Sequence, residues 1–232
     1  MNEKDSFTKL CQVIDSLLGE NGCPWDKAQT HQSLRSDVLE ESYEVAEAID
    51  NEDMQSLKEE LGDLLLQVML HSKIAEKAGH FNLEEVFNHL ADKLISRHSH
   101  IFGKDMAKNA EEALHTWESN KIKEKAFSTP LEYMQAVPKA LPALTRAQKV
   151  IKRSNKSLVE NFSTETAIEE IENLLNNLRE DIDGVNNDII NEADMEICGR
   201  ILFLMTQISN KKQINAEMSL TNAVQTYINS FM

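Results

Sequence analysis

Two stretches with apolar residues at helical spacing lie on either side of a short polar break. In the first stretch Val38, Val45 and Ile49 recur on one face. In the second stretch a leucine-rich stripe recurs with the same period, formed by Leu57, Leu61, Leu64, Leu65 and Val68. Between them, residues 50–53 read Asp-Asn-Glu-Asp, which suits a short connection. The pattern therefore predicts two antiparallel helices, at 39–49 and 57–70.

Helical spacing continues through most of the chain. It predicts a first helix over residues 4–19, a helix capped by Asn82 that ends near Arg97, and a polar helix over 110–125. In the helix after Asn82, apolar residues are expected to face inward: Val86, Phe87, Leu90, Leu94 and Ile95. The chain has 7 Gly and 4 Pro, too few for a turn-rich all-β fold. The predicted fold class is all-α.

Acidic residues follow the two central helices in a regular arrangement. Glu40, Glu41, Glu44 and Glu47 fill the face of the first helix opposite its apolar residues. On the second helix Glu60 and Asp63 form an i,i+3 pair, and the leucines around Asp63 predict that its carboxylate is buried and needs a partner.

The pairs Glu41/Glu44 and Glu60/Asp63 could bring four carboxylates to one point. Hard oxygen donors of this kind select Mg²⁺, Mn²⁺ or Ca²⁺. The spacing alone leaves a second interpretation open, in which these acids form a solvated helix face.

The pattern Glu40-Glu41-x-x-Glu44, followed by Glu60-x-x-Asp63, resembles the signature of the MazG-type nucleoside triphosphate pyrophosphohydrolases, in the all-α NTP pyrophosphatase superfamily. Further blocks of the resemblance follow in order: Cys23-Pro24-Trp25-Asp26-Lys27, Arg97-His98-Ser99-His100-Ile101-Phe102, Trp117-Glu118-x-x-Lys121 and Leu141-Pro142-Ala143-Leu144. The resemblance is dense from about Gly22 to Lys152 and thin beyond. It departs from the family pattern at Ser96, where the family usually carries an arginine.

This resemblance implies a reaction and a set of roles. The reaction is hydrolysis of NTPs and dNTPs to a nucleoside monophosphate and pyrophosphate, as house-cleaning of nucleotides, with Mg²⁺ as cofactor and Mn²⁺ as a possible substitute. The implied metal ligands are Glu41, Glu44, Glu60 and Asp63. Glu40 and Glu41 are the expected catalytic residues, and Glu40 is the candidate for positioning or deprotonating the attacking water. The resemblance also implies a homodimer.

The implied substrate-binding residues have plainer alternatives. Lys93 and Arg97 share a helix face and could meet one phosphate group, but they could also be an exposed basic pair near a helix C-terminus. Trp117 could stack on the nucleotide while Lys121 meets phosphate, or Trp117 could simply cover the bundle beside a solvated lysine.

The second half of the chain resembles a degenerate repeat of the first half. The prolines from Pro130 to Pro142 mark the clearest break, and we predict domains at 1–126 and 127–232. Ile168-Glu169-Glu170 occupies the place of the first acid cluster, while Ile197 and Arg200 replace Glu60 and Asp63. The similarity of the two halves predicts a tandem of MazG-like helical bundles. An arginine cannot ligate a cation, so the second half has lost its metal ligands. The second bundle is degenerate, and we expect it to be structural or to support dimerisation.

The uncovered apolar surface predicts dimerisation independently of the resemblance. A single layer of four helices would leave the stripe from Leu57 to Val68 exposed, together with Leu66 and Leu70. We therefore expect helices to pack across a dimer interface.

Charge and composition narrow the partners. A net charge of −15 and a pI near 4.9 argue against a nucleic-acid polymer as partner, and an anionic nucleoside triphosphate then requires metal ions and a local basic cluster. The three cysteines are widely separated, and neither a signal segment nor a membrane-spanning run is present, which predicts a cytoplasmic protein without membrane partners.

Two other functions stay open at this point. One is a pyrophosphatase specialised for one nucleotide, such as dUTP, dCTP or a damaged base. The other is a catalytically silent acidic helical protein that binds a partner. The intact acid quartet favours an enzyme over the second alternative.

Overall fold

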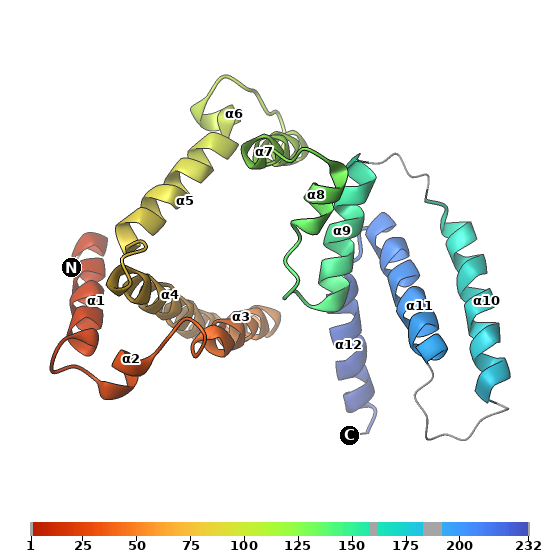
Figure 1. Ribbon diagram of the computed structural model, residues 1–232, viewed down its shortest axis with the longest axis horizontal. Coiled ribbons are helices and arrows are strands. Elements are labelled where there is room, and N and C mark those ends of the chain that lie inside the picture. The colour runs from red at the N-terminus through yellow and green to blue at the C-terminus, as the bar shows by residue number, and fades with distance from the viewer. Residues whose placement is uncertain (1, 158–161, 183–191, 232) are drawn as a thin grey trace. The chain divides into compact units, whose positions relative to one another are not determined.

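The computed structural model describes residues 2–157, 162–182 and 192–231. All regular secondary structure in these described segments is helical, which confirms the predicted all-α class. No helix among them is long and apolar enough to cross a membrane. The chain divides into two compact units, Met1–Lys121 and Ile122–Met232, and each is described by itself (Figure 1). The division falls inside a helix, a few residues before the predicted domain boundary.

Unit 1 contains six complete helices and the greater part of a seventh, within its described residues. They are α1 (Glu3–Leu18), α2 (Pro24–Ala28), α3 (Arg35–Asp50), α4 (Met54–Lys77), α5 (Leu83–Arg97), α6 (Ser99–Phe102) and α7 (Ala110–Lys125), whose last residues belong to unit 2.

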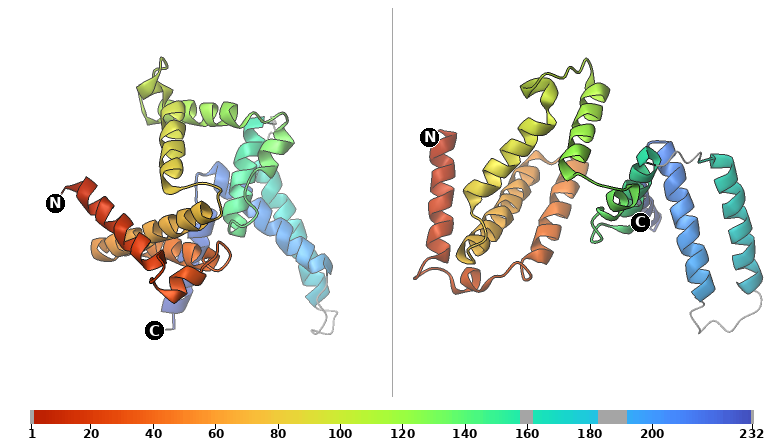
Figure 2. Two further views of the ribbon diagram at one scale, coloured as in Figure 1. Left: turned by 60° about the vertical axis from the view of Figure 1, so that its left-hand side comes forward. Right: turned by 45° about the horizontal axis from the view of Figure 1, so that its top comes forward.

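Helices α3 and α4 form the predicted hairpin and lie side by side in both figures (Figures 1 and 2). Only Asn51, Glu52 and Asp53 connect them, and Glu52 takes a positive φ of 55° to reverse the chain. Asp53 caps α4, because its carboxylate accepts hydrogen bonds from the backbone N–H groups of Gln55 and Ser56. The short connection fixes the register of the two helices, and with it the relative positions of their acids.

The core of unit 1 only partly follows the predicted faces. On α4 the buried residues are Gln67, Met69, Leu70, Ser72 and Ala75. Leu70 is 3% exposed, so the prediction that it would be uncovered in a single chain is wrong. Leu61, by contrast, is 51% exposed, and Leu65 and Val68 are also open to solvent, as predicted for an uncovered stripe.

Helix α5 begins at the predicted cap but does not bury the predicted face. Asn82 accepts a hydrogen bond from the Glu85 N–H, and the Glu85 carboxylate accepts one from the Asn82 N–H, which closes a capping box. Phe87, Leu90, Leu94 and Ile95 were predicted to face inward, but in unit 1 all four are exposed. Helical periodicity identifies the apolar face of α5 correctly, but it does not say whether the same chain covers that face.

A pair of histidines ties the loop before α3 to α4. The rings of His31 and His71 are stacked, with an interplanar angle of 4°, and their Nδ1 atoms lie 2.7 Å apart. At this distance one Nδ1 must donate a hydrogen bond while the other accepts it. Burial lowers the pKa of His71, and the charge of a protonated His31 lowers it further. The pair is therefore compatible with at most one proton being shared between the facing nitrogens.

Unit 2 contains the end of α7 and five further helices within its described residues. They are α8 (Pro130–Gln135), α9 (Ala143–Ser157), α10 (Thr164–Ile182), α11 (Glu192–Lys211) and α12 (Ala216–Asn229). Helix α9 packs against α8, α11 and α12. The Gln148 side chain of α9 donates to the Ile214 carbonyl and accepts from the Ala216 N–H, which anchors the start of α12.

We expect the histidine pair to make stability depend on pH. Because the pKa of His71 is lowered in the folded state from its ordinary value of 6.5, the unfolded chain binds this proton more readily. The stabilising contribution of neutral His71 is complete above pH 6.5 and is lost as the pH falls through the folded-state pKa. The stability advantage of the wild type over His71→Gln should therefore shrink as the pH falls below 6.5, as measured by urea denaturation at a series of pH values. The exposed residue His89 provides the control, since His89→Gln should leave the pH profile of stability unchanged. A His71→Gln variant whose pH profile is identical to that of the wild type would refute the expectation.

Candidate active site

Three carboxylates from the α3–α4 hairpin meet at one point. Glu41 of α3 and Glu60 and Asp63 of α4 each offer a carboxylate oxygen, and these oxygens all lie within 4.8 Å of one another. All three residues are half-buried. The i,i+3 spacing puts Glu60 and Asp63 on the same side of α4, and the register set by the three-residue connection brings Glu41 opposite them.

The electrostatics show that this negative charge is not balanced. Burial raises the pKa of Glu41, and the neighbouring charges of Asp63 and Glu44 raise it further. Burial likewise raises the pKa of Glu60, with Glu44 as the next largest cause. Both carboxylates are thus harder to ionise than usual, first because burial disfavours their charged form and then because like charges lie nearby. Three carboxylate oxygens in reach of one point form a donor set that fits a hard divalent cation, which would remove this repulsion.

Glu44 and Glu40 lie at the edge of the cluster. The Glu44 side chain shares a hydrogen bond with Glu60, but Glu44 is exposed and is not one of the three residues whose oxygens converge. Glu40 is also exposed, and it is close enough to contribute to the raised pKa of Glu41. Asp63 is half-buried where full burial was predicted. The acid cluster is therefore partly open to solvent, as a site that receives a ligand must be.

Two of the three predicted cationic residues, Arg97 and Lys121, lie against the ring of Trp117. The Arg97 guanidinium lies over the Trp117 ring at 5.2 Å from its centroid, and the Lys121 ammonium lies at 4.9 Å. Arg97 is only 6% exposed, so it is not the solvated helix-end residue of the plainer interpretation. Trp117 and Lys121 are half-buried, and so is Lys93, one turn before Arg97 on α5. Helices α5 and α7 thus place a preformed aromatic and cationic cluster in unit 1.

Asn120 was not predicted to belong to this cluster, but its side chain links α7 to Arg97 and Ser99. Its carboxamide donates to the Ser99 hydroxyl at 2.6 Å and to the Arg97 carbonyl at 3.4 Å. Ser99 in turn donates to the Asp105 carboxylate at 2.5 Å. Asn120 lies three residues after Trp117, on the same side of α7, which is the one sequence feature that could have pointed to it.

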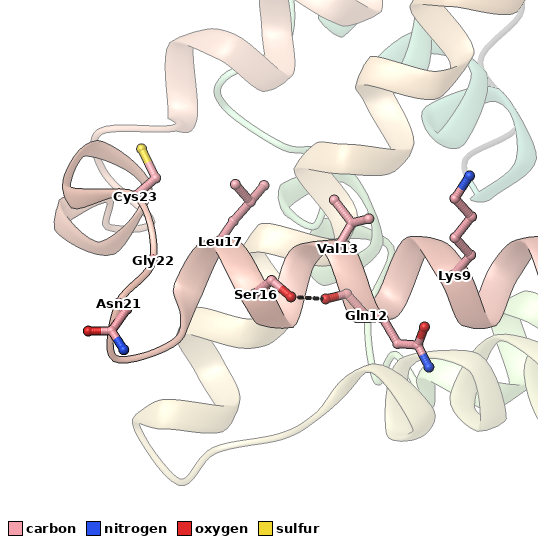
Figure 3. Close-up of a pocket in the computed structure, with 8 residues that line it drawn as sticks. All are labelled: Lys9, Gln12, Val13, Ser16, Leu17, Asn21, Gly22 and Cys23. Carbon is pink, nitrogen blue, oxygen red and sulfur yellow. Dashed lines mark hydrogen bonds between the residues drawn. The ribbon is translucent and has the colours of Figure 1, made fainter.

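A separate hollow of about 530 Å³ runs along α1 and the loop after it (Figure 3). Val13, Leu17 and Cys23 give it apolar walls, and Lys9 is its one charged lining residue. Its lining includes no residue of the acid cluster or of the cationic cluster, so we do not assign it to the same site.

The helical hairpin carries a carboxylate cluster whose oxygens fit a divalent cation, and α5 and α7 carry a cationic and aromatic cluster; together they define the class, an all-α protein with both features in one unit. Comparison with known proteins is consistent with this class. Residues 29–102 match the model of the MazG nucleotide pyrophosphohydrolase domain. This range contains every residue of the acid cluster, and it includes Lys93 and Arg97.

Three relatives illustrate how far the similarity extends. The nucleoside triphosphate pyrophosphohydrolase of Escherichia coli K12 is 33% identical over 232 residues, which covers 100% of this chain and 86% of that protein. The nucleoside triphosphate pyrophosphohydrolase/pyrophosphatase MazG of Thermotoga maritima is 33% identical over 97% of this chain and 84% of its own. The uncharacterized protein YabN of Bacillus subtilis is 44% identical over 146 residues, 63% of this chain but 30% of that longer protein. The chain belongs to the MazG family of nucleoside triphosphate pyrophosphohydrolases.

Proposed function

We propose that this protein hydrolyses nucleoside and deoxynucleoside triphosphates between the α- and β-phosphates, releasing a nucleoside monophosphate and pyrophosphate, with Mg²⁺ as its cofactor. The observation that carries the proposal is the convergence of Glu41, Glu60 and Asp63 within a chain related over its full length to enzymes of that name. Clearance of unwanted nucleotides is the role we assign to this reaction.

The acid cluster supplies the ligands of the metal. We assign Glu41, Glu60 and Asp63 as its ligands, with Glu44 as the fourth, because the exposed Glu44 carboxylate already shares a hydrogen bond with Glu60 at the edge of the cluster. Bound there, Mg²⁺ or Mn²⁺ would neutralise phosphate oxygens and lower the pKa of a bound water. Glu40 is exposed beside Glu41, and we assign it to position or deprotonate the attacking water.

The cationic cluster binds the rest of the substrate. Lys93, Arg97 and Lys121 meet the phosphates and absorb the charge that develops on them during cleavage, while Trp117 stacks on the nucleotide. Arg97 and Lys121 already flank the Trp117 ring, so the cationic groups are oriented before substrate arrives. Preformed positive charge is needed because the chain as a whole carries a net charge of −15 and repels a triphosphate.

The apolar surface of unit 1 supports a homodimer. Leu61, Leu65 and Val68 on α4 and the aromatic and leucine face of α5 are exposed in the single chain. Exposed apolar residues that recur along two neighbouring helices are typical of a subunit interface. We propose that a second copy of this chain covers them.

A panel of triphosphates tests the reaction. Incubated with Mg²⁺ and analysed by anion-exchange chromatography, ribo- and deoxynucleoside triphosphates should all yield monophosphate and pyrophosphate in equal amounts. Turnover confined to one nucleotide, such as dUTP or dCTP, would establish the specialised alternative. Absence of turnover across the panel would favour a silent binding protein, and release of orthophosphate would contradict the proposed bond cleavage.

The acid cluster can be tested residue by residue. Glu41→Gln and Asp63→Asn keep the size of each side chain but remove a charged oxygen donor, so each should lower turnover by at least about a hundredfold, the upper end of losses seen for second-shell changes at metal sites. Thermal melts followed by circular dichroism should show that both variants fold. Glu47→Gln is the matched control, since Glu47 is an exposed acid of the same helix that lies outside the cluster. Turnover that is unaffected by Asp63→Asn, or equally lost in Glu47→Gln, would contradict the assignment.

Sedimentation velocity tests the dimer. At micromolar concentration the wild type should sediment as a dimer, and Leu61→Glu should shift it to monomer because a charge would then be buried in an apolar interface. Gln55→Glu adds the same charge at an exposed polar position of α4 and should remain dimeric. A wild type that is monomeric throughout would remove the proposal without affecting the chemistry of the acid cluster.

A further inference from the structure

Helices α10 and α11 of unit 2 lie side by side and are joined by a bidentate ion pair (Figure 1). Arg200 Nε donates to Glu170 Oε1 at 2.7 Å, and Nη2 donates to Oε2 at 3.1 Å. This fork-to-fork geometry is the most directional contact that a guanidinium makes with a carboxylate. The pair connects the two helices at one point along their length.

The two residues occupy the positions of metal ligands in unit 1. Glu170 follows Glu169 as Glu41 follows Glu40, and Arg200 follows Gly199 as Asp63 follows Gly62. In unit 1 the corresponding residues, Glu41 and Asp63, bring their oxygens together across α3 and α4. The ion pair of unit 2 therefore joins the same two positions that the acid cluster joins in unit 1.

The remaining two positions have lost their carboxylates. Asn173 stands where the pattern places Glu44, and Ile197 stands where it places Glu60. Of four acids, only the counterpart of Glu41 remains in unit 2.

The two hairpins also end in the same kind of turn. Helix α4 is followed by Gly79 with φ of 74°, and α11 by Gln213 with φ of 58°. In both places the next backbone N–H donates back to the last turn of the helix, and an asparagine then caps the following helix: Asn82 for α5 and Asn215 for α12. The turn lies 16 residues after Asp63 and 13 residues after Arg200, so the two helices end alike but at different lengths.

The charges on the two hairpins are balanced in opposite ways. In unit 1 the carboxylate oxygens of Glu41, Glu60 and Asp63 meet at one point. In unit 2 the hydrogen bond from Arg200 lowers the pKa of Glu170, because a fixed cation is already beside it. One hairpin gathers negative charge that an external cation can balance, and the other carries its own cation.

We propose that α10–α11 is a copy of the metal-binding hairpin in which the guanidinium of Arg200 takes the place of the metal ion, so that this chain binds divalent cations in unit 1 only. The inference rests on the proposed metal role of the α3–α4 acids for its comparison. It also makes a prediction of its own: Arg200 and the loss of carboxylates at Asn173 and Ile197 prevent unit 2 from binding a metal ion. This prediction is tested separately.

Mn²⁺ binding provides the test, measured by electron paramagnetic resonance and isothermal titration calorimetry. Asp63→Asn should remove all tight Mn²⁺ binding from the chain. In that background, the triple change Asn173→Glu, Ile197→Glu and Arg200→Asp rebuilds the four-carboxylate pattern in unit 2 and should restore tight binding. The single change Arg200→Gln in the same background should not restore tight Mn²⁺ binding, because Glu170 would then be the only carboxylate ligand left in the pattern. In an otherwise wild-type chain, Arg200→Gln should leave triphosphate turnover unchanged.

The outcomes separate this inference from the proposed function. If the wild type binds no Mn²⁺ while the rebuilt unit 2 does, the proposed metal site of unit 1 fails, but the prediction that Arg200 and the lost carboxylates prevent metal binding in unit 2 stands. If the rebuilt variant keeps the wild-type helical content and melting behaviour but binds no Mn²⁺, the inference is wrong. If the rebuilt variant does not fold, Glu170→Gln decides in an otherwise wild-type chain: unchanged Mn²⁺ binding supports the inference, and a loss of bound Mn²⁺ overturns it.

Discussion

Repulsion among the acids of the α3–α4 hairpin is the constraint on which the rest of this structure depends. Bringing Glu41, Glu60 and Asp63 within 4.8 Å of one another costs free energy, and these neighbouring acids add to the effect of burial in raising the pKa values of Glu41 and Glu60. A hairpin with a loose connection would relax by moving the helices apart. The three-residue connection, the cap at Asp53 and the buried face of α4 prevent this. The fold therefore holds the charges together, and a bound cation of the kind we propose would neutralise them.

The two units solve this problem differently. In unit 1 the charge is left for an ion from solution, which makes the site dependent on that ion and able to bring the ion to a substrate. In unit 2 the ion pair of Arg200 and Glu170 is half-exposed, and a pair of this kind contributes little to stability by itself. Its effect lies in what it excludes: a covalently attached cation cannot leave, cannot polarise a phosphate and cannot generate a nucleophile from water. Under the two proposals made above, local electrostatics would make unit 1 the reactive half of the chain and unit 2 the inert half.

The sequence was sufficient to predict the hairpin and the acids on it, because helical periodicity and a short polar break depend only on neighbours in the chain. The Asn82 cap was predictable for the same reason. The outcome at Leu61 and Leu70 was not, since both follow the same periodicity and only packing distinguishes an exposed leucine from a buried one. The pairing of Arg200 with Glu170 depends on the register of two helices joined by a long connection, which residue types alone do not fix. The contact of Arg97 with Trp117 likewise required α5 and α7 to be placed in space.

The burial of Arg97 explains how an acidic chain can hold a cationic cluster ready for an anion. A guanidinium that is 6% exposed must satisfy its donors and its charge within the protein, and the face of Trp117 provides part of that environment. Asn120 then fixes the backbone at Arg97 through its carbonyl. Trp117 and Asn120 thus hold Arg97 in place beside Lys121, in a chain whose net charge of −15 repels a triphosphate.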